Sequence, residues 1–97
     1  MTDKYDRQGN SMDLMEWAAK MEDVEYKRVA QDVVGDTTVS TVWLGLNHNF
    51  GPGKPLIFET MVFGGEHSDW QDWYSTEAEA IAGHRRVVAA IQRGEAP

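Results

Sequence analysis

The sequence predicts an α+β fold with an N-terminal helix, a three-stranded antiparallel β-meander and a C-terminal helix packed on the sheet. Two runs, residues 38–46 and 56–63, are rich in β-branched and aromatic residues, as neighbouring strands should be. Gly35-Asp36 precedes the first run, and Gly at the first central position suits a two-residue type II′ hairpin turn. Apolar residues at helical spacing flank these runs on both sides. The 97 residues fit one such domain.

The N-terminal helix is expected to begin near residue 11 and to end near residue 22. Apolar residues recur there at three- and four-residue spacing and would share one helix face: Leu14, Trp17, Ala18 and Met21. Ser11 or Asp13 can cap the first turn. A helix this short is marginal alone, so its apolar face must dock on the rest of the domain.

The folded domain is expected to comprise residues 11–94. Residues 1–10 (MTDKYDRQGN) are polar and lack periodicity, which favours a disordered lead-in. Residues 95–97 follow Gly94, a typical helix stop, and are expected to fray. The sequence therefore predicts one folded unit with short loose ends.

The first strand is expected at residues 24–34, along an edge of the sheet, because Lys27 and Arg28 would blunt an edge against further pairing. A two-residue hairpin loop fixes the register and predicts these cross-strand pairs: Val34 with Thr37, Val29 with Val42, Arg28 with Trp43, and Tyr26 with Gly45. The next strand has apolar residues on both faces, so we expect it to be central and covered on both sides.

The last part of the chain is expected to be a loop followed by a long helix. Residues 66–74 (EHSDWQDWY) are polar for the most part and are predicted to form the loop. Thr76 and Glu79 have the spacing of a capping box, and Gly94 is a fitting stop. The apolar face of the helix would consist of Ala80, Ile81, His84, Val87, Val88 and Ile91.

The composition excludes several classes of function. A formal net charge of −7 and a pI of about 4.7 argue against direct nucleic-acid binding, which depends on clusters of Lys and Arg. Without cysteine, the chain has no disulfide, thiolate nucleophile or Cys-ligated zinc. No apolar run approaches the ~20 residues that span a bilayer, and no signal peptide opens the sequence. A cytoplasmic protein with no membrane partner is therefore expected.

One long phrase carries a family resemblance. VSTVWLGLNHNFGPGKPLIFETMVFGG, followed by YSTEAEAIAGH, resembles a family of small, mostly uncharacterised proteins encoded by bacteriophages and prophages. The upstream MDLMEWAAKMED also fits that family, so the resemblance covers residues 12–88. It implies a phage accessory protein that works inside a bacterial cell. Members are generally catalogued without an activity, so the resemblance implies no catalytic residue.

Residues 47–54 (NHNFGPGK) are a first candidate site, because they form a loop by every turn rule and loops often carry binding sites. A ligand-holding turn would use His48, Asn49 and Phe50, with Lys54 available for an anion. The other interpretation is a turn whose Asn and His side chains bond their own backbone. The loop does not match the phosphate-binding GxxxxGK[ST] pattern, because too few residues separate its glycines.

Polar residues elsewhere are further candidates: Glu59, His67 and His84. None has HExxH or another recognised metal-ligand spacing, so we expect no bound metal and no cofactor. His84 could belong to a pocket or be a core histidine with one hydrogen bond. A buried Glu59 would have to be paired or protonated, and could then act as an acid or base. Alternatively, its carboxylate reaches water or Arg85.

The tryptophans near residue 70 are the third candidate. An exposed aromatic patch for a protein partner could form there, since Trp and Tyr dominate interface hot spots; its members would be Trp43, Phe63, Trp70, Trp73 and Tyr74. The alternative places Trp43, Phe63 and Tyr74 in the core and leaves only the two loop tryptophans partly exposed.

These observations favour a non-enzymatic phage accessory protein that binds a host or phage protein through its acidic surface and residues 66–74. The alternative is a small-molecule module that binds or sequesters a nucleotide signal, with its pocket at residues 47–54, Glu59, His67 and His84. A small metal-dependent hydrolase is the third hypothesis. The free strand edges also suggest a homodimer, joined edge to edge or through the aromatic face.

Overall fold

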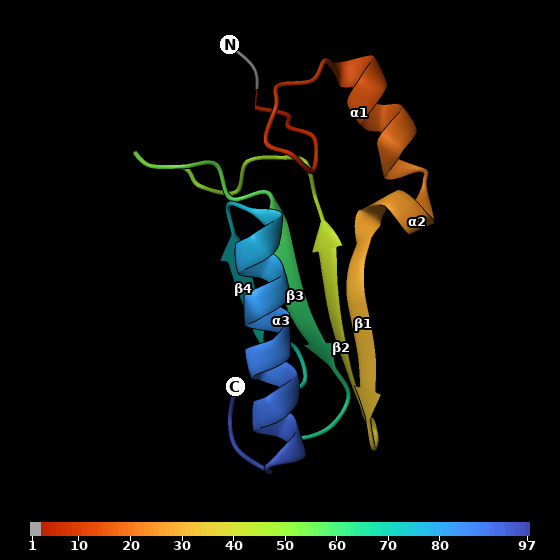
Figure 1. Ribbon diagram of the computed structural model, residues 1–97, viewed down its shortest axis with the longest axis vertical. Helices are drawn as coiled ribbons and strands as arrows, with labels where there is room; N and C mark the ends of the chain where they lie inside the picture. The colour runs from red at the N-terminus through yellow and green to blue at the C-terminus, as the bar shows by residue number, and fades with distance from the viewer. Residues whose placement is uncertain (1–2) are drawn as a thin grey trace.

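The computed structural model describes residues 3–97 and shows a four-stranded antiparallel sheet with a long helix on one face (Figure 1). In chain order the elements are α1 (Leu14–Met21), α2 (Val24–Lys27), β1 (Arg28–Val34), β2 (Thr37–Trp43), β3 (Phe58–Phe63), β4 (Gln71–Tyr74) and α3 (Glu77–Gln92). The strands follow one another across the sheet in the order β1-β2-β3-β4. The α+β class and the docking of the C-terminal helix on the sheet are confirmed, but the sheet has four strands rather than three. Within residues 3–97, no helix is long and apolar enough to cross a membrane.

The additional strand, β4, replaces part of the loop expected at residues 66–74. It pairs antiparallel with β3, with Tyr74 opposite Phe58. The chain turns back to make this pairing through left-handed backbone at Gly64, Gly65 and Asp69. The segment QDWY is only four residues long, and although Trp and Tyr favour a strand, Asp does not. Pairing with β3, rather than local sequence, makes it a strand.

The first strand is shorter than expected, because residues 24–27 form the helix α2. Asp23 caps this helix: its carboxylate accepts a hydrogen bond from the backbone N–H of Tyr26 at 3.1 Å. The ring of Tyr26 then meets the ring of Trp43 edge to face, with centroids 5.0 Å apart. Tyr26 therefore covers the end of β2 instead of extending β1.

The hairpin between β1 and β2 has the expected turn but not the full expected register. Val34 pairs with Thr37, as predicted, and Gly35 has the positive φ of 61° that the turn requires. Farther from the turn, a β-bulge between Arg28 and Ala30 shifts the pairing by one residue. Three predicted pairs are therefore wrong: Val29 with Val42, Arg28 with Trp43, and Tyr26 with Gly45.

Residues 3–12 lie against one end of the sheet, which differs from the disordered lead-in expected for residues 1–10; residues 1 and 2 of that lead-in lie outside the described part. The backbone carbonyl of Tyr5 accepts a hydrogen bond from the indole Nε1–H of Trp43 at 2.9 Å. The N-terminal segment thereby supplies the partner that a buried indole needs.

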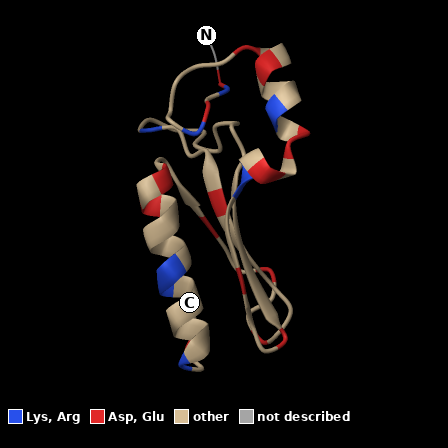
Figure 2. Cartoon of the chain, turned by 45° about the vertical axis from the view of Figure 1, so that its right-hand side comes forward, with Lys and Arg blue, Asp and Glu red and all other residues tan. Residues whose placement is uncertain are grey.

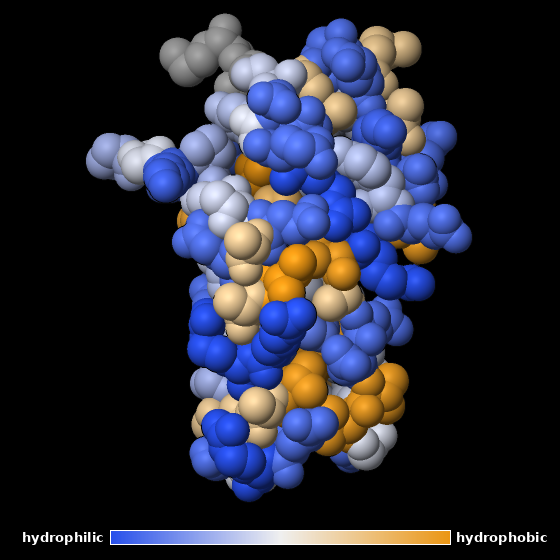
Figure 3. Space-filling model, viewed as in Figure 1, coloured by the Kyte–Doolittle hydropathy of each residue, from blue (hydrophilic) through white to orange (hydrophobic). Residues whose placement is uncertain are grey.

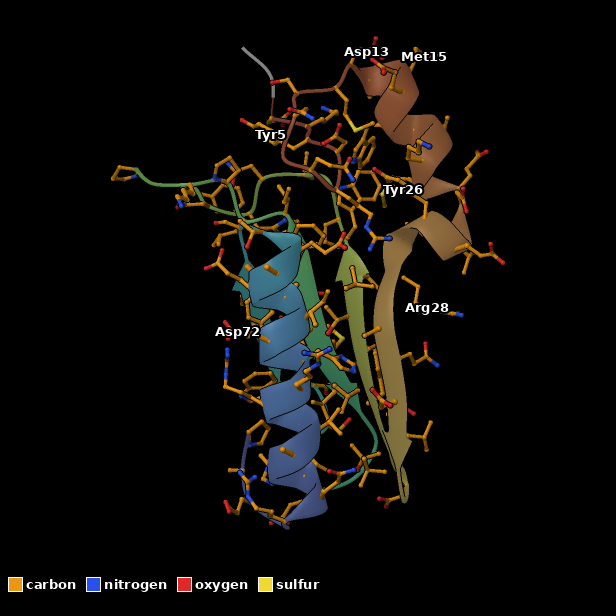
Figure 4. The ribbon with its side chains drawn as sticks, in the orientation of Figure 1. Tyr5, Asp13, Met15, Tyr26, Arg28 and Asp72 are labelled. Atoms are coloured by element: carbon orange, nitrogen blue, oxygen red, sulfur yellow. The ribbon has the colours of Figure 1, made fainter. Side chains whose placement is uncertain are left out.

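Two further contacts attach this segment to the domain. The side chain of Arg7 donates to the carboxylate of Glu77 at the start of α3 (2.6 Å) and to the backbone carbonyl of Tyr26 (3.0 Å). Met12 is 9% exposed and belongs to the main hydrophobic cluster. Figure 4 shows Tyr5 and Tyr26 at the same end of the strands.

The sheet is covered on one face. Alternate residues of β2 are buried against α3, namely Thr37, Val39, Thr41 and Trp43. The opposite side, called the open face below, carries the residues between them on β2 and their cross-strand partners on β3: Thr38, Ser40, Val42, Glu59, Met61 and Phe63. No described helix lies along it (Figure 2). The expectation that the second strand is covered on both sides is wrong, because an antiparallel sheet can leave one face to solvent.

The buried side chains form two clusters. The larger one lies toward the N-terminal segment and contains Met12, Trp43, Ile57, Phe58, Tyr74 and Ala80. The smaller contains Val39, Val62 and Val87, with Trp70, Val88 and Ile91 packed against it. Both clusters include residues of α3, so the helix is the main cover of the core.

Candidate functional site

A groove with a volume of about 460 Å³ runs between the β4 edge of the sheet and α3. Aromatic side chains line it on the strand side, at Trp70 and Tyr74, and guanidinium groups line it on the helix side, at Arg86 and Arg93. We call it the β4–α3 groove. The rest of the surface on the α3 side is mostly hydrophilic, with small groups of hydrophobic side chains (Figure 3).

The aromatic side of the groove is positioned by β4 and α3 together. The backbone N–H of Val62 donates to the carbonyl of Trp70 at 3.0 Å, which places Trp70 beside Val62. The side chain of Trp70 packs against the smaller core cluster, which includes Val62 and Val87 of α3. The ring of Tyr74 lies against Gly83 of α3, where an added Cβ would overlap the phenol. A glycine at this helix position therefore allows α3 to approach β4 closely.

The charged side of the groove has an unpaired cation. Arg86 makes no ion pair among the described residues, whereas Arg93 donates to Glu95 at 2.9 Å. Asp72 lies beside α3 (Figure 4), and its carboxylate accepts a hydrogen bond from the backbone N–H of Trp73 at 2.9 Å. Arg86 is therefore the one lining arginine without an ion pair among the described residues, because Arg93 is already paired with Glu95.

Burial raises the pKa of Tyr74 above its usual value of 10.0, although Thr60 and Arg86 act in the opposite direction. The phenol oxygen is buried and has no hydrogen bond of good geometry, even though Thr60 and Asp72 lie near it. Tyr74 therefore stays protonated at neutral pH and offers an uncommitted hydroxyl under α3.

His84 belongs to a buried chain of hydrogen bonds rather than to a pocket. It is 3% exposed, and its Nε2–H donates to the carboxylate of Asp32 at 2.7 Å. The other ring nitrogen, Nδ1, is hydrogen-bonded to the hydroxyl of Thr41 at 2.7 Å, and the hydroxyl of Thr41 contacts that of Thr60 at 2.5 Å. This order resembles a nucleophilic triad, but Thr41 and Thr60 are fully buried, so no substrate reaches them. The geometry matches the core-histidine interpretation, with two hydrogen bonds instead of one.

The loop at residues 47–54 uses its polar side chains on its own backbone. His48 Nδ1 is hydrogen-bonded to the carbonyl of Leu46 at 2.9 Å. The amide of Asn49 donates to the carbonyl of Lys54 at 3.0 Å and accepts from the N–H of Gly51 at 3.0 Å. This is the arrangement expected of a self-bonded turn. Phe50, which was a candidate ligand contact, is 94% exposed and packs on nothing described.

Glu59 and His67 lie far apart in the fold. Glu59 is half-exposed on the open face, opposite Trp73 of β4, whereas Arg85 stands on α3 on the other side of the sheet. Glu59 therefore reaches solvent and not Arg85. His67 lies in the β3–β4 turn and lines a cavity of about 250 Å³ near the β1–β2 turn.

The predicted site residues are not brought together. His48, His67 and His84 belong to three separate regions, and no group of three His, Asp or Glu side chains within residues 3–97 could hold a metal ion. These residues therefore do not form one pocket or one metal site.

Trp70 and Trp73 lie on opposite faces of the sheet, so they do not form one aromatic patch. Trp70 lines the β4–α3 groove, whereas Trp73 pairs with Glu59 on the open face. Of the residues that the alternative placed in the core, Trp43 is buried, but Phe63 is 48% exposed.

The arginines of the groove were not predicted from the sequence. Arg86 lies on α3 and Arg93 is the residue that caps its C-terminal end, about two helical turns farther along the same side. That spacing can be read from the sequence. The groove has a second side only because β4 lies beside α3, and β4 was not predicted. Trp70 was named as a candidate, and the structure places it in the groove.

No protein-family model matches the chain, and no curated protein or solved structure does either. The geometry of the β4–α3 groove and the sequence resemblance are therefore the observations that bear on function.

Proposed function

We propose that this chain is a small, non-enzymatic accessory protein of a bacteriophage or prophage, and that it binds a host or phage protein in the bacterial cytoplasm through the β4–α3 groove. The observation that carries the proposal is the convergence of Trp70, Tyr74 and Arg86 on one concave site. Trp, Tyr and Arg are the residue types that carry most binding energy in protein interfaces.

The shape of the groove suits a side chain or short segment of a partner. Trp70 and Tyr74 offer apolar contact, while Arg86 and Arg93 lie at separate points along α3. A partner segment with an apolar or aromatic anchor flanked by acidic groups would complement both features. The proposed contact is therefore this groove with its exposed Arg86, rather than the acidic surface in general.

The phage setting is supported by the resemblance of residues 12–88 to phage-encoded proteins. Small size and high net charge suit an accessory protein that acts by association. The same resemblance is the basis for placing it in the bacterial cytoplasm.

A nucleotide-binding module is the second candidate, and one observation favours it. The groove volume of about 460 Å³ lies within the range of ligand pockets, roughly 300–1,000 Å³. Trp70 could stack on a base and Arg86 could bind a phosphate. The loop at residues 47–54 is less suited, because its polar groups are already hydrogen-bonded within it.

Arg86→Glu tests both candidates, because Arg86 is exposed and its reversal leaves the core intact. Arg85→Glu is the matched control: the same charge change, one residue earlier on the exposed side of α3. Tagged full-length variants are used for affinity capture from infected or lysogenic cells. We expect wild type and Arg85→Glu to capture the same partner, and Arg86→Glu to bind it about thirtyfold more weakly.

Equal capture by all three proteins would show that the groove is not the contact. A thermal shift with added nucleoside phosphates distinguishes the second candidate, since a ligand that binds only the folded state raises the Tm. A shift in wild type and Arg85→Glu, lost in Arg86→Glu, would favour nucleotide binding over a protein partner.

A further inference from the structure

The open face carries few charges on a chain that has many. Its charged residues are Arg28 on β1 and Glu59 on β3, and these cancel, whereas the whole chain has a net charge of −7. Two of its apolar side chains are well exposed, Val33 by 67% and Phe63 by 48%. Low charge with exposed apolar side chains is typical of the centre of a protein interface.

The strand register arranges the open face in rows across β1, β2 and β3. The rows are Val33, Thr38 and Phe63; Gln31, Ser40 and Met61; and Arg28, Val42 and Glu59. In each row the β1 and β3 residues lie on either side of β2, one strand spacing of about 4.8 Å away. The two flanking strands are therefore placed symmetrically about β2.

This symmetry makes the face complementary to itself. If two copies stack with a twofold axis parallel to β2, the axis exchanges the β1 and β3 positions of every row. Arg28 then lies opposite the partner's Glu59. In another row, Val33 lies opposite the partner's Phe63. Opposite charges meet, and the most exposed apolar side chains cover each other.

We infer that the open face is covered by a second copy of this chain, in a symmetric dimer that stacks sheet on sheet. Such sheets pack about 10 Å apart with strands within roughly 30° of each other. Within one copy, Arg28 and Glu59 lie two strands apart and form no ion pair, so the partner supplies the opposite charge to each. Figure 4 shows Arg28 extending away from β1.

The proposed dimer is independent of partner binding in the β4–α3 groove. The β4–α3 groove lies on the α3 side of the sheet, so stacking through the open face leaves it accessible in both copies. A dimer without groove binding, or groove binding by a monomer, would each be recognised in the separate tests.

Charge reversal at Arg28 and Glu59 tests the inference directly. The full chain, with a mass of 10.9 kDa, is studied by sedimentation equilibrium and light scattering over a wide concentration range. We expect wild type to reach twice that mass. Arg28→Glu places like charges opposite each other twice in the dimer and should raise the dissociation constant at least about tenfold. The double variant Arg28→Glu with Glu59→Arg restores opposite charges and should dimerise nearly as well as wild type.

Arg85→Glu is the control for net charge, because it makes the same change on α3 and should leave the dimer intact. Phe63→Ser is a second variant on the face, at a side chain that is 48% exposed and outside both core clusters. It should also weaken the dimer, with an unchanged circular dichroism spectrum.

A wild-type chain that stays monomeric at every concentration would overturn the inference. So would a dimer whose strength is the same in Arg28→Glu and Phe63→Ser. If Arg28→Glu weakens the dimer and the double variant does not restore it, the proposed twofold arrangement is wrong.

Discussion

The ring of Tyr74 lies against Gly83, and both residues line the β4–α3 groove. The contact determines how closely α3 approaches the edge of the sheet, and it removes the phenol hydroxyl from water. A buried hydroxyl without a good hydrogen bond is unfavourable even while it stays protonated, and becomes more unfavourable when it ionises.

This single residue leads to a prediction at alkaline pH. Burial raises the pKa of Tyr74 above 10.0, so the unfolded chain loses the proton at lower pH than the folded chain. The contribution of Tyr74 to the free energy of unfolding is complete below pH 10 and declines as the pH rises through the folded-state pKa. Tyr74→Phe should unfold with at least the wild-type free energy at pH 7 and should show a shallower loss of stability above pH 10. Urea unfolding at a series of pH values measures this.

Tyr5→Phe is the control for removing a phenol hydroxyl elsewhere in the chain. If Tyr74→Phe and wild type lose stability equally above pH 10, then Tyr74 does not titrate differently in the two states.

At the scale of elements, α3 has the best-defined start in the chain. The hydroxyl oxygen of Thr76 accepts a hydrogen bond from the N–H of Glu79 at 3.1 Å, and the hydroxyl donates to the Glu79 carboxylate at 2.9 Å. Glu77 and Glu79 add negative charge to the first turn, where the helix dipole favours it. Gly94, with φ of 72°, follows the C-terminal end, as the sequence predicted.

The cap yields a prediction for the helix. Thr76→Ala removes the acceptor for the Glu79 N–H and should lower the free energy of unfolding by about 1 kcal/mol. Thr76→Ser keeps a hydroxyl in the same place and should lower it by much less. Chemical denaturation of both variants measures the difference, and an equal loss in both would mean that the methyl group, not the cap, matters.

At the scale of the whole molecule, the N-terminal segment covers the end of the sheet at which β2 ends. Tyr5 supplies the carbonyl for the buried indole of Trp43, Met12 fills part of the main cluster, and Arg7 connects the segment to Glu77. The helix α1 has no buried residue. It is held by the indole of Trp17, which donates to the carbonyl of Leu44 at 3.1 Å.

A shortened chain tests whether this segment belongs to the fold. A chain that begins at Asp13 loses the burial of Met12 and leaves the indole of Trp43 without its acceptor. We expect the free energy of unfolding to fall by about 3 kcal/mol, from lost apolar burial and one unsatisfied buried donor. Urea unfolding followed by tryptophan fluorescence measures it.

Gln8→Ala in the full chain is the control, because Gln8 is exposed. If the shortened chain is as stable as the control, residues 3–12 do not stabilise the fold, as their composition predicts for a disordered lead-in.

Features that depend on neighbouring residues could be predicted from the sequence. The turn at Gly35 and the pairing of Val34 with Thr37 follow from loop length and glycine conformation. The start of α3 at Thr76 follows from the cap. Each of these is decided within a few residues, where the chain cannot choose between distant partners.

Features that depend on residues distant in the sequence were decided by the tertiary structure. The segment QDWY becomes β4 because β3 presents an unpaired edge, and Trp70 and Arg86 become a site only when β4 lies beside α3. His84 finds Asp32 and Thr41 across the sheet in the same way. Local patterns predict the fold class, the central strands and the long helix, because periodicity and capping act over a few residues. The tertiary structure decided the fourth strand, the groove and the open face, because their free energy comes from contacts that exist only once the sheet has formed.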